Sequence, residues 1–242
     1  MKRILSLLLL SISCLVIVAQ GPTKKCPTCG LSIAKCEYRG KHPMTGMENG
    51  HVWIDLGLPS GTKWATMNVG ANSPEESGDY FAWGETSMKS DYGWDNQKYC
   101  IDGSDKFTKY VTNSEYGNKD GKKELDLEDD AANVNWGKGW CMPNDSQIAE
   151  LRSNCTHAWT TMNGVSGYKL TSKKNGNSIF LPAVGYRTNR LDGVGVSGYY
   201  WSRSLWTSYC DYAYCIEFYT DSYSWHYRTR EMGFCVRPVL AQ

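Results

Sequence analysis

Four residues near the start of the chain have the types and spacing of a metal site. They follow one another as C-x2-C-x6-C-x5-H, at Cys26, Cys29, Cys36 and His42. Three sulfur ligands and one imidazole suit tetrahedral Zn²⁺ in a closed structural site. The sequence therefore predicts a small zinc-knuckle-like unit which, with its linker, covers residues 20–46.

Disulfide formation is the alternative for the same cysteines. The segment has few apolar residues, so a metal or a disulfide would have to hold it together. In an oxidising compartment Cys26 would pair with Cys29, or one of them with Cys36, and His42 would take no part. We favour zinc, and we expect no redox role because no thioredoxin-like βαβ pattern surrounds the CxxC pair.

A second group of residues with binding chemistry lies within residues 198–239, where rings and polar side chains outnumber aliphatic ones. Contact surfaces favour large amphipathic rings, whereas a core needs Leu, Ile and Val. The candidate ligand-binding residues are Trp206, Tyr209, Asp211, Tyr212, Tyr223, Trp225, His226, Tyr227, Arg228 and Arg230. We expect four of them to share one exposed face, namely Tyr212, Trp225, Tyr227 and Arg228. The alternation through Tyr212, Tyr214, Ile216 and Phe218 places one strand face in the core.

Residues 124–136 begin with several carboxylates in close order. One interpretation is a Ca²⁺ site, because hard cations take oxygen ligands. The other is the acidic first turn of a helix, capped by Asp126 or Asp129. We favour the helix, because the glycine-bearing spacing of a Ca²⁺ loop is absent from the sequence.

The N-terminus predicts an exported protein. A basic start precedes an apolar run over residues 4–18, and Ala19 offers a small residue for cleavage. This pattern is typical of a secretory signal peptide, here residues 1–19. A lipoprotein anchored at Cys14 is the alternative, but the apolar run continues past that cysteine. We expect the mature chain to be secreted, periplasmic or at the cell surface, with no membrane-spanning segment.

Charge and histidine placement argue against several functions. The chain has 26 Lys and Arg against 25 Asp and Glu, so its overall charge indicates neither nucleic acid nor a membrane surface as partner. Its four histidines are scattered, and no set of nucleophile, base and orienting group can be assembled from the sequence. We therefore expect no catalytic site and no redox cofactor.

The elements that must position these residues are short strands, tight turns and about two helices. We expect strands at residues 51–56, 63–69, 78–85, 164–171 and 178–183. A helix over 146–155 would be capped by Asn144 or Asp145, with Ile148, Leu151 and Cys155 facing inward. Linker or loop is expected at residues 43–49, 87–123 and 185–198.

Several motifs recur in an order that carries a family resemblance. They are NGH at 49–51, WIDLGLPSG at 53–61, NVG at 68–70, DAA at 130–132, IFLPA at 179–183, GYR at 185–187, GYYWS at 198–202 and VRPV at 236–239. The chain resembles the Fibrobacter succinogenes major paralogous domain family over about residues 47–240. Those are exported proteins of gut and rumen Bacteroidetes and their relatives.

That family in turn looks like a branch of the C-type-lectin-like fold shared with formylglycine-generating enzymes. The resemblance implies an α+β domain with small twisted antiparallel sheets and about two helices. It also implies a disulfide between Cys155 and Cys215, and it puts Cys235 near Cys141, where these two could form a second disulfide. Cys100 and Cys210 are left over. The Glu-Pro-Asn and Trp-Asn-Asp signatures of calcium-dependent lectins are absent from the sequence, so the fold alone does not predict a lectin.

The enzymes of that fold bind copper through two thiols in a segment resembling Cys-His-x-Ser-Tyr-Cys. Here Cys210 is kept, but Leu205 stands for the first thiol and Trp206 for the histidine. One thiolate cannot make a Cu(I) site, so formylglycine chemistry is the least favoured function.

Proteins of this fold are sometimes diversified by retroelements that rewrite codons in the last part of the domain, and residues 204–231 fit such a surface. We therefore predict an exported module that binds a host, microbial or glycan ligand. A structural or adhesin-type surface subunit is the alternative.

Overall fold

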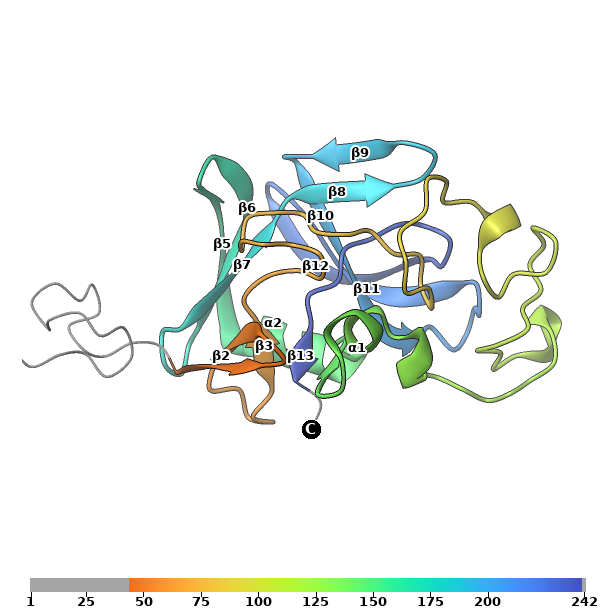
Figure 1. The fold of residues 1–242 in the computed structure, drawn as a ribbon, viewed down its shortest axis with the longest axis horizontal. Coiled ribbons are helices and arrows are strands. Elements are labelled where there is room, and N and C mark those ends of the chain that lie inside the picture. Colours follow the sequence, from red (N-terminus) through yellow and green to blue (C-terminus); the bar gives the residue numbers. More distant parts are fainter. Residues whose placement is uncertain (1–43, 241–242) are drawn as a thin grey trace, which may run out of the picture. The chain divides into compact units, whose positions relative to one another are not determined.

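The computed structural model describes residues 44–240 (Figure 1). The predicted signal peptide at residues 1–19 lies outside the described residues. So do the four predicted zinc ligands, Cys26, Cys29, Cys36 and His42.

Thirteen strands form three sheets within residues 44–240. The first sheet has the order β1-β2-β3-β13-β4, at Thr45–Glu48, His51–Asp55, Lys63–Ala65, Val239–Leu240 and Trp140–Cys141. The second has the order β12-β11-β10-β8-β9, at Ser222–Thr229, Tyr212–Tyr219, Ser197–Leu205, Val184–Arg187 and Leu191–Val194. The third has the order β5-β6-β7, at Cys155–Met162, Val165–Ser172 and Ser178–Pro182.

Two α-helices accompany the sheets in the described part of the chain, α1 (Ala131–Trp136) and α2 (Asp145–Asn154). Three short 3₁₀ turns, η1, η2 and η3, lie at Trp94–Asn96, Ser114–Tyr116 and Leu127–Asp129. All strand pairs are antiparallel except β10 with β8. The expected α+β class is confirmed.

Helix α2 forms where the sequence predicts it, because two backbone N–H groups at its N-terminus find side-chain acceptors. The Asn144 side chain accepts from the backbone N–H of Gln147, and the Gln147 side chain accepts from the backbone N–H of Asn144, each at 2.9 Å. This reciprocal pair is a capping box. Ile148 and Leu151 are fully buried, so the expected inner face of the helix is confirmed.

The second sheet separates two hydrophobic clusters. Successive side chains of a strand point to opposite faces. Tyr200 of β10 and Ile216 of β11 therefore belong to one cluster, while Trp201 and Cys215 belong to the other. In Figure 1 this sheet lies between the third sheet on one side and the long segment of residues 87–123 on the other.

Distant motifs of the sequence meet at a buried arginine. The Nε of Arg237 donates to the side chain of Asn68 at 2.8 Å, and its Nη1 donates to the carbonyl of Thr66 at 3.1 Å. Burial lowers the pKa of Arg237 to about 10. The VRPV and NVG motifs thus contribute to one internal contact that ties the end of the domain to its beginning.

Three expectations about the elements are corrected. β1 occupies part of the expected linker at 43–49 and pairs with β2, so the boundary predicted at residue 47 falls inside a strand. The segment 78–85 is buried around Phe81 but forms only an isolated bridge with Phe234. Residues 185–198 hold most of the β8–β9 hairpin instead of a loop. The apolar residues Leu191 and Val194 of β9 are both exposed. The sequence of this strand therefore lacks the alternation of apolar and polar residues that would predict it.

Strand β5 had no expectation, although it pairs with β6 over its whole length. The burial of its residues explains this, since only Cys155 of the strand is buried and the others show no clear two-residue period. The expected surface excursion at 87–123 is only partly exposed, because Phe107, Tyr110 and Val111 are fully buried in it.

Gly198 provides a test of the second sheet. It pairs with Phe218, and a Cβ built on it would lie 2.2 Å from that ring. We expect Gly198→Ala to lower the free energy of unfolding by about 2 kcal/mol, because the ring has to move within a packed core. Gly93→Ala is the matched control, since its Cβ would meet only Asp91 at 4.0 Å. Equal urea midpoints for the two variants would contradict the packing described here.

Candidate ligand-binding site

Strand pairing divides the predicted ligand-binding residues into two groups. In the β11–β12 hairpin Tyr214 lies opposite Tyr227, and Ile216 lies opposite Trp225. Directly opposed residues share a face of the sheet. Arg228, opposite Ala213, points to the other face and does not join Tyr227. The expected four-residue cluster is therefore corrected at Arg228, while Tyr212, Trp225 and Tyr227 do share a face.

Five of the predicted residues line one cavity of about 480 Å³, named here the aromatic pocket: Trp206, Tyr209, Asp211, Tyr212 and Tyr227. Three rings surround Trp206. The ring centroids of Tyr209 and Tyr212 lie 5.1 Å and 5.7 Å from that of Trp206, and Tyr227 packs directly against it. Sequence reasoning thus selected every residue of this pocket.

The turn between β10 and β11 sets the position of these rings. The backbone N–H of Trp206 donates to the carbonyl of Tyr212 at 3.1 Å. The N–H groups of Tyr209 and Tyr212 donate to the carbonyls of Trp206 and Tyr209, at 3.2 Å and 3.0 Å. These hydrogen bonds fix the backbone of the turn that carries Trp206, Tyr209 and Tyr212.

One acidic residue, Asp211, lines the aromatic pocket. Asp211 Oδ1 is buried and has no hydrogen-bond partner within residues 44–240. Burial raises the pKa of Asp211. Tyr209 is 50% exposed, so the pocket combines accessible ring surface with the side chain of one acidic residue.

Three other predicted residues serve packing. Tyr223 is only 8% exposed and stacks on His157, with ring centroids 5.0 Å apart. Trp225 is partly buried and stacks on Tyr214 at 4.7 Å. Arg230 is fully buried, lies over the rings of Trp83 and Phe107, and donates to the carbonyl of Cys210 at 2.9 Å. Tyr223 and Arg230 are therefore corrected from surface positions to core positions.

The opposite face of the hairpin holds a polar network. Arg228 Nη2 donates to Glu217 Oε1 at 2.6 Å, and Tyr219 Oη donates to the same oxygen at 3.0 Å. His226 Nδ1 lies 3.0 Å from the carbonyl of Tyr227. Since Arg228 already has a carboxylate partner, this network is an internal support of the sheet.

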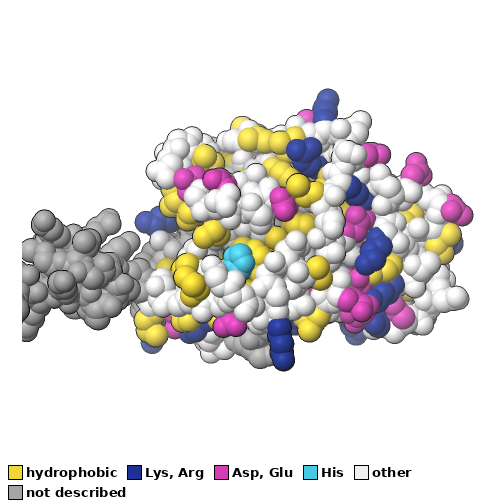
Figure 2. Space-filling view, in the orientation of Figure 1, with side chains coloured by type: hydrophobic (Ala, Val, Ile, Leu, Met, Phe, Trp, Pro, Cys, Tyr) yellow, Lys and Arg dark blue, Asp and Glu magenta, His cyan; other side chains and the backbone are white. Residues whose placement is uncertain are grey.

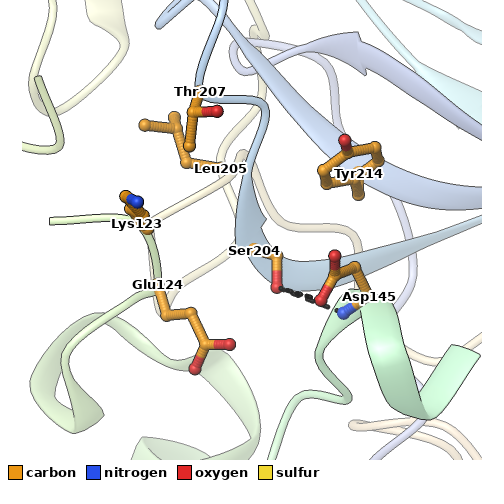
Figure 3. A pocket seen from close by; sticks show the side chains of 7 residues that line it. All are labelled: Lys123, Glu124, Asp145, Ser204, Leu205, Thr207 and Tyr214. Atoms are coloured by element: carbon orange, nitrogen blue, oxygen red, sulfur yellow. Dashed lines mark hydrogen bonds between the residues drawn. The ribbon is translucent and has the colours of Figure 1, made fainter. Parts of the chain in front are cut away.

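A second, smaller cavity of about 240 Å³ lies beside the aromatic pocket, and we name it the polar pocket. Its lining residues are Lys123, Glu124, Asp145, Ser204, Leu205, Thr207 and Tyr214 (Figure 3). Ser204 Oγ accepts from the backbone N–H of Asp145 at 3.1 Å. Ser204, Leu205, Thr207 and Tyr214 fall within the predicted surface at 204–231, although none is among the ten candidate ligand-binding residues. Lys123, Glu124 and Asp145 come from distant segments, which no local spacing signals.

The six cysteines within residues 44–240 are all free thiols, so neither implied disulfide is formed in this structure. Cys155 belongs to one hydrophobic cluster and Cys215 to the other. Since β11 separates the clusters, those two sulfur atoms lie on different sides of the sheet and cannot bond. Cys141 and Cys235 share a cluster but are likewise unbonded.

The acidic segment is neutralised by lysines. Asp126, Glu128 and Asp129 lie close enough to hold a cation. However, Asp129 accepts from Lys98 Nζ at 2.7 Å and from Lys109 Nζ at 2.6 Å. Neither predicted cap, Asp126 or Asp129, caps the helix. It begins at Ala131, and the side chain of Asp130 caps it by accepting from the backbone N–H groups of Ala132 and Asn133, so the acidic residues precede the first turn.

Comparisons of the chain with family models, with curated proteins and with solved structures found no match. The family resemblance carried by the sequence motifs therefore stays a prediction. Among residues 44–240, the structure has no helix both long and apolar enough to cross a membrane.

Asp129 is the first residue to test for stability. Besides the two lysines, it accepts from the hydroxyls of Tyr99 and Tyr110. We expect Asp129→Asn to lower the free energy of unfolding by about 2 kcal/mol, because a buried charged acceptor is lost while its donors stay. Glu128→Gln is the control, since this 77% exposed side chain pairs with Lys109 at the surface and should matter by less than about 0.5 kcal/mol. Urea unfolding measures both.

The same carboxylate makes stability depend on pH. Burial alone would raise the pKa of Asp129, but bonds from Lys109, Lys98, Tyr110 and Tyr99 outweigh burial and hold this pKa well below its usual range. Because the unfolded chain takes up the proton first, the contribution is complete above about pH 5 and begins to be lost as pH falls below about 4. The loss continues down to the lowered pKa of the folded state. Between pH 5 and pH 3 the wild type should lose more stability than Asp129→Asn. Parallel curves would refute the assignment.

Proposed function

We propose that this chain is an exported ligand-binding module and that the aromatic pocket is its binding site. The observation that carries the proposal is the gathering of five residues, selected by residue type alone, around one cavity of about 480 Å³. Ligand pockets of this size are lined mainly by apolar and aromatic side chains with a few polar groups. Here Asp211 is that polar group.

The chemistry of the rings supports recognition. Tyr and Trp supply large contact area with few rotatable bonds, so little conformational entropy is lost when a ligand binds. Tyr209 and Trp206 sit on a hydrogen-bonded turn, which further reduces that cost. A preorganised aromatic site of this kind is suited to binding.

We also propose the C-type-lectin-like fold and the Fibrobacter succinogenes major paralogous domain family, on the order of the motifs and the α+β class. Sequence diversification, if it acts on this chain, would be confined to positions such as Tyr209 that are not part of the core. Tyr223 and Arg230 would stay constant because they are buried. Zinc at the N-terminal cysteines completes the proposal.

The proposal excludes formylglycine chemistry. Cys210 is fully buried, and its sulfur lies 3.3 Å from the backbone nitrogen of Thr112. Leu205, at the position of the first copper-binding thiol, is also buried. A substrate would have to displace core side chains to reach that sulfur, which supports binding over catalysis.

The test is binding of the mature protein, from Gln20 onward, to glycan and protein arrays. We expect Tyr209→Ser with Tyr227→Ser to weaken binding at least about tenfold, because aromatic anchors dominate such sites. Tyr219→Ser is the matched control, since Tyr219 is 41% exposed but belongs to the opposite face of the hairpin. Unchanged binding by the double variant, or equal loss in the control, would place the site elsewhere.

A structural subunit is the second candidate, and exposed edges of the second sheet favour it. β12 and β9 are the two edge strands. Leu191, Val194 and Val196, in and beside β9, are exposed aliphatic residues, and open edges with such residues invite pairing with another chain. Two results together would replace the binding proposal with this one. The protein would bind nothing on the arrays, and it would assemble in a concentration-dependent way that Val194→Lys abolishes.

A further inference from the structure

We infer that the polar pocket is a second subsite of the same binding site, and that the two pockets together take a neutral oligosaccharide. The inference rests on the proposed function, because it assumes that the aromatic pocket binds a ligand. It goes beyond that function by assigning the ligand class and by adding residues outside the predicted set.

The two pockets adjoin on one face of the β11–β12 hairpin. Tyr214 lines the polar pocket and lies directly opposite Tyr227, which lines the aromatic pocket. Tyr212, also in the aromatic pocket, is two residues from Tyr214 on the same strand face. At the turn, Thr207 of the polar pocket follows Trp206 of the aromatic pocket. A ligand longer than one ring can therefore contact both.

The charges around the polar pocket balance. Glu124 and Asp145 are its carboxylates, and Lys123 is its ammonium group. Arg203 forms an ion pair with Glu124 at 3.0 Å. A cationic peptide would meet Lys123 and Arg203, and an anionic ligand would meet the two carboxylates. Figure 2 shows acidic and basic side chains intermixed over the face that it displays.

Donors and acceptors in the polar pocket suit hydroxyl groups. The carboxylate oxygens accept, Lys123 donates, and the hydroxyls of Thr207 and Tyr214 can do either. A sugar hydroxyl is both donor and acceptor, so neighbouring hydroxyls of one ring can use both kinds of partner. Figure 3 shows these side chains arranged around a common space.

The aromatic pocket suits the other part of a sugar. A pyranose ring presents a face of C–H groups, and the electron-rich face of an aromatic ring attracts such groups. Tyr209 provides accessible ring surface for this contact, and Trp206 and Tyr212 form the wall beside it. The side chain of Asp211 also lines this pocket and adds a polar group beside the rings. A ligand that stacks in the aromatic pocket and forms hydrogen bonds in the polar pocket must be longer than one sugar ring, so we assign an oligosaccharide.

The test is calorimetric titration of the mature full-length chain with neutral tetrasaccharides of β-1,4-linked glucose, xylose and mannose. Tetragalacturonate and a tetralysine peptide serve as anionic and cationic probes. We expect one or more neutral probes to bind and both charged probes to bind at least about tenfold more weakly.

Two polar-pocket variants then separate the subsites. Glu124→Gln with Tyr214→Phe keeps the side-chain shapes, including the stack on Trp225, and removes a charge and a hydroxyl. We expect about tenfold weaker sugar binding. Thr207→Val, at an exposed position, should give a smaller loss and covers the case in which the double variant fails to fold. Glu128→Gln is the control and should change nothing, because it lies in neither pocket.

The outcomes distinguish the two proposals. Sugar binding that weakens in both the polar-pocket variants and the Tyr209→Ser, Tyr227→Ser variant supports the inference. A protein or charged ligand that is lost with the aromatic variant overturns the oligosaccharide and leaves the proposed site standing. Sugar binding unaffected by the polar-pocket variants also overturns the second subsite. Sugar binding unaffected by the aromatic variant overturns both proposals.

Discussion

The structure depends on the pairing of β10, β11 and β12, because this sheet divides the interior. In β11, Ala213 and Cys215 face one cluster, while Ile216 and Phe218 face the other. If the pairing of β11 slipped by one residue, Ile216 would turn to the face that Cys215 now occupies. Glu217 would then turn toward the other cluster, away from its present partners. Gly198 and Phe218 hold the register by close contact.

Buried polar groups hold the long loops to this sheet. Arg230 lies among the rings of Trp83, Phe107 and Tyr110, which come from segments without regular strands. Asp129 joins two lysines and two tyrosines from residues 98–110. Such groups are costly to bury unless they are satisfied, so each one restricts the loops to a single arrangement. The face that carries both pockets is positioned by these contacts and by the sheet.

The organisation of the site follows from the two faces of the β11–β12 hairpin. On one face of the hairpin, Ile216 and Phe218 pack into the hydrophobic core. Farther along the same face, Tyr214 and Tyr227 line the two pockets. The other face ends in the ion pair of Arg228 with Glu217. Rings of the same kind thus have different roles according to their distance from the core. This is why a list of aromatic residues contains both pocket walls and core packing.

The sequence by itself determined the local features. The capping box of α2, the α+β class and the aromatic character of the 206–212 turn depend on neighbouring residues or on composition, so patterns reveal them. Tertiary structure alone decided that Arg230 is buried, that Cys155 and Cys215 lie on opposite sides of a sheet, and that Glu124, Asp145 and Tyr214 meet in one pocket. These facts depend on which strands pair and in which register. That choice is made by contacts between residues far apart in the chain, and no local pattern contains it.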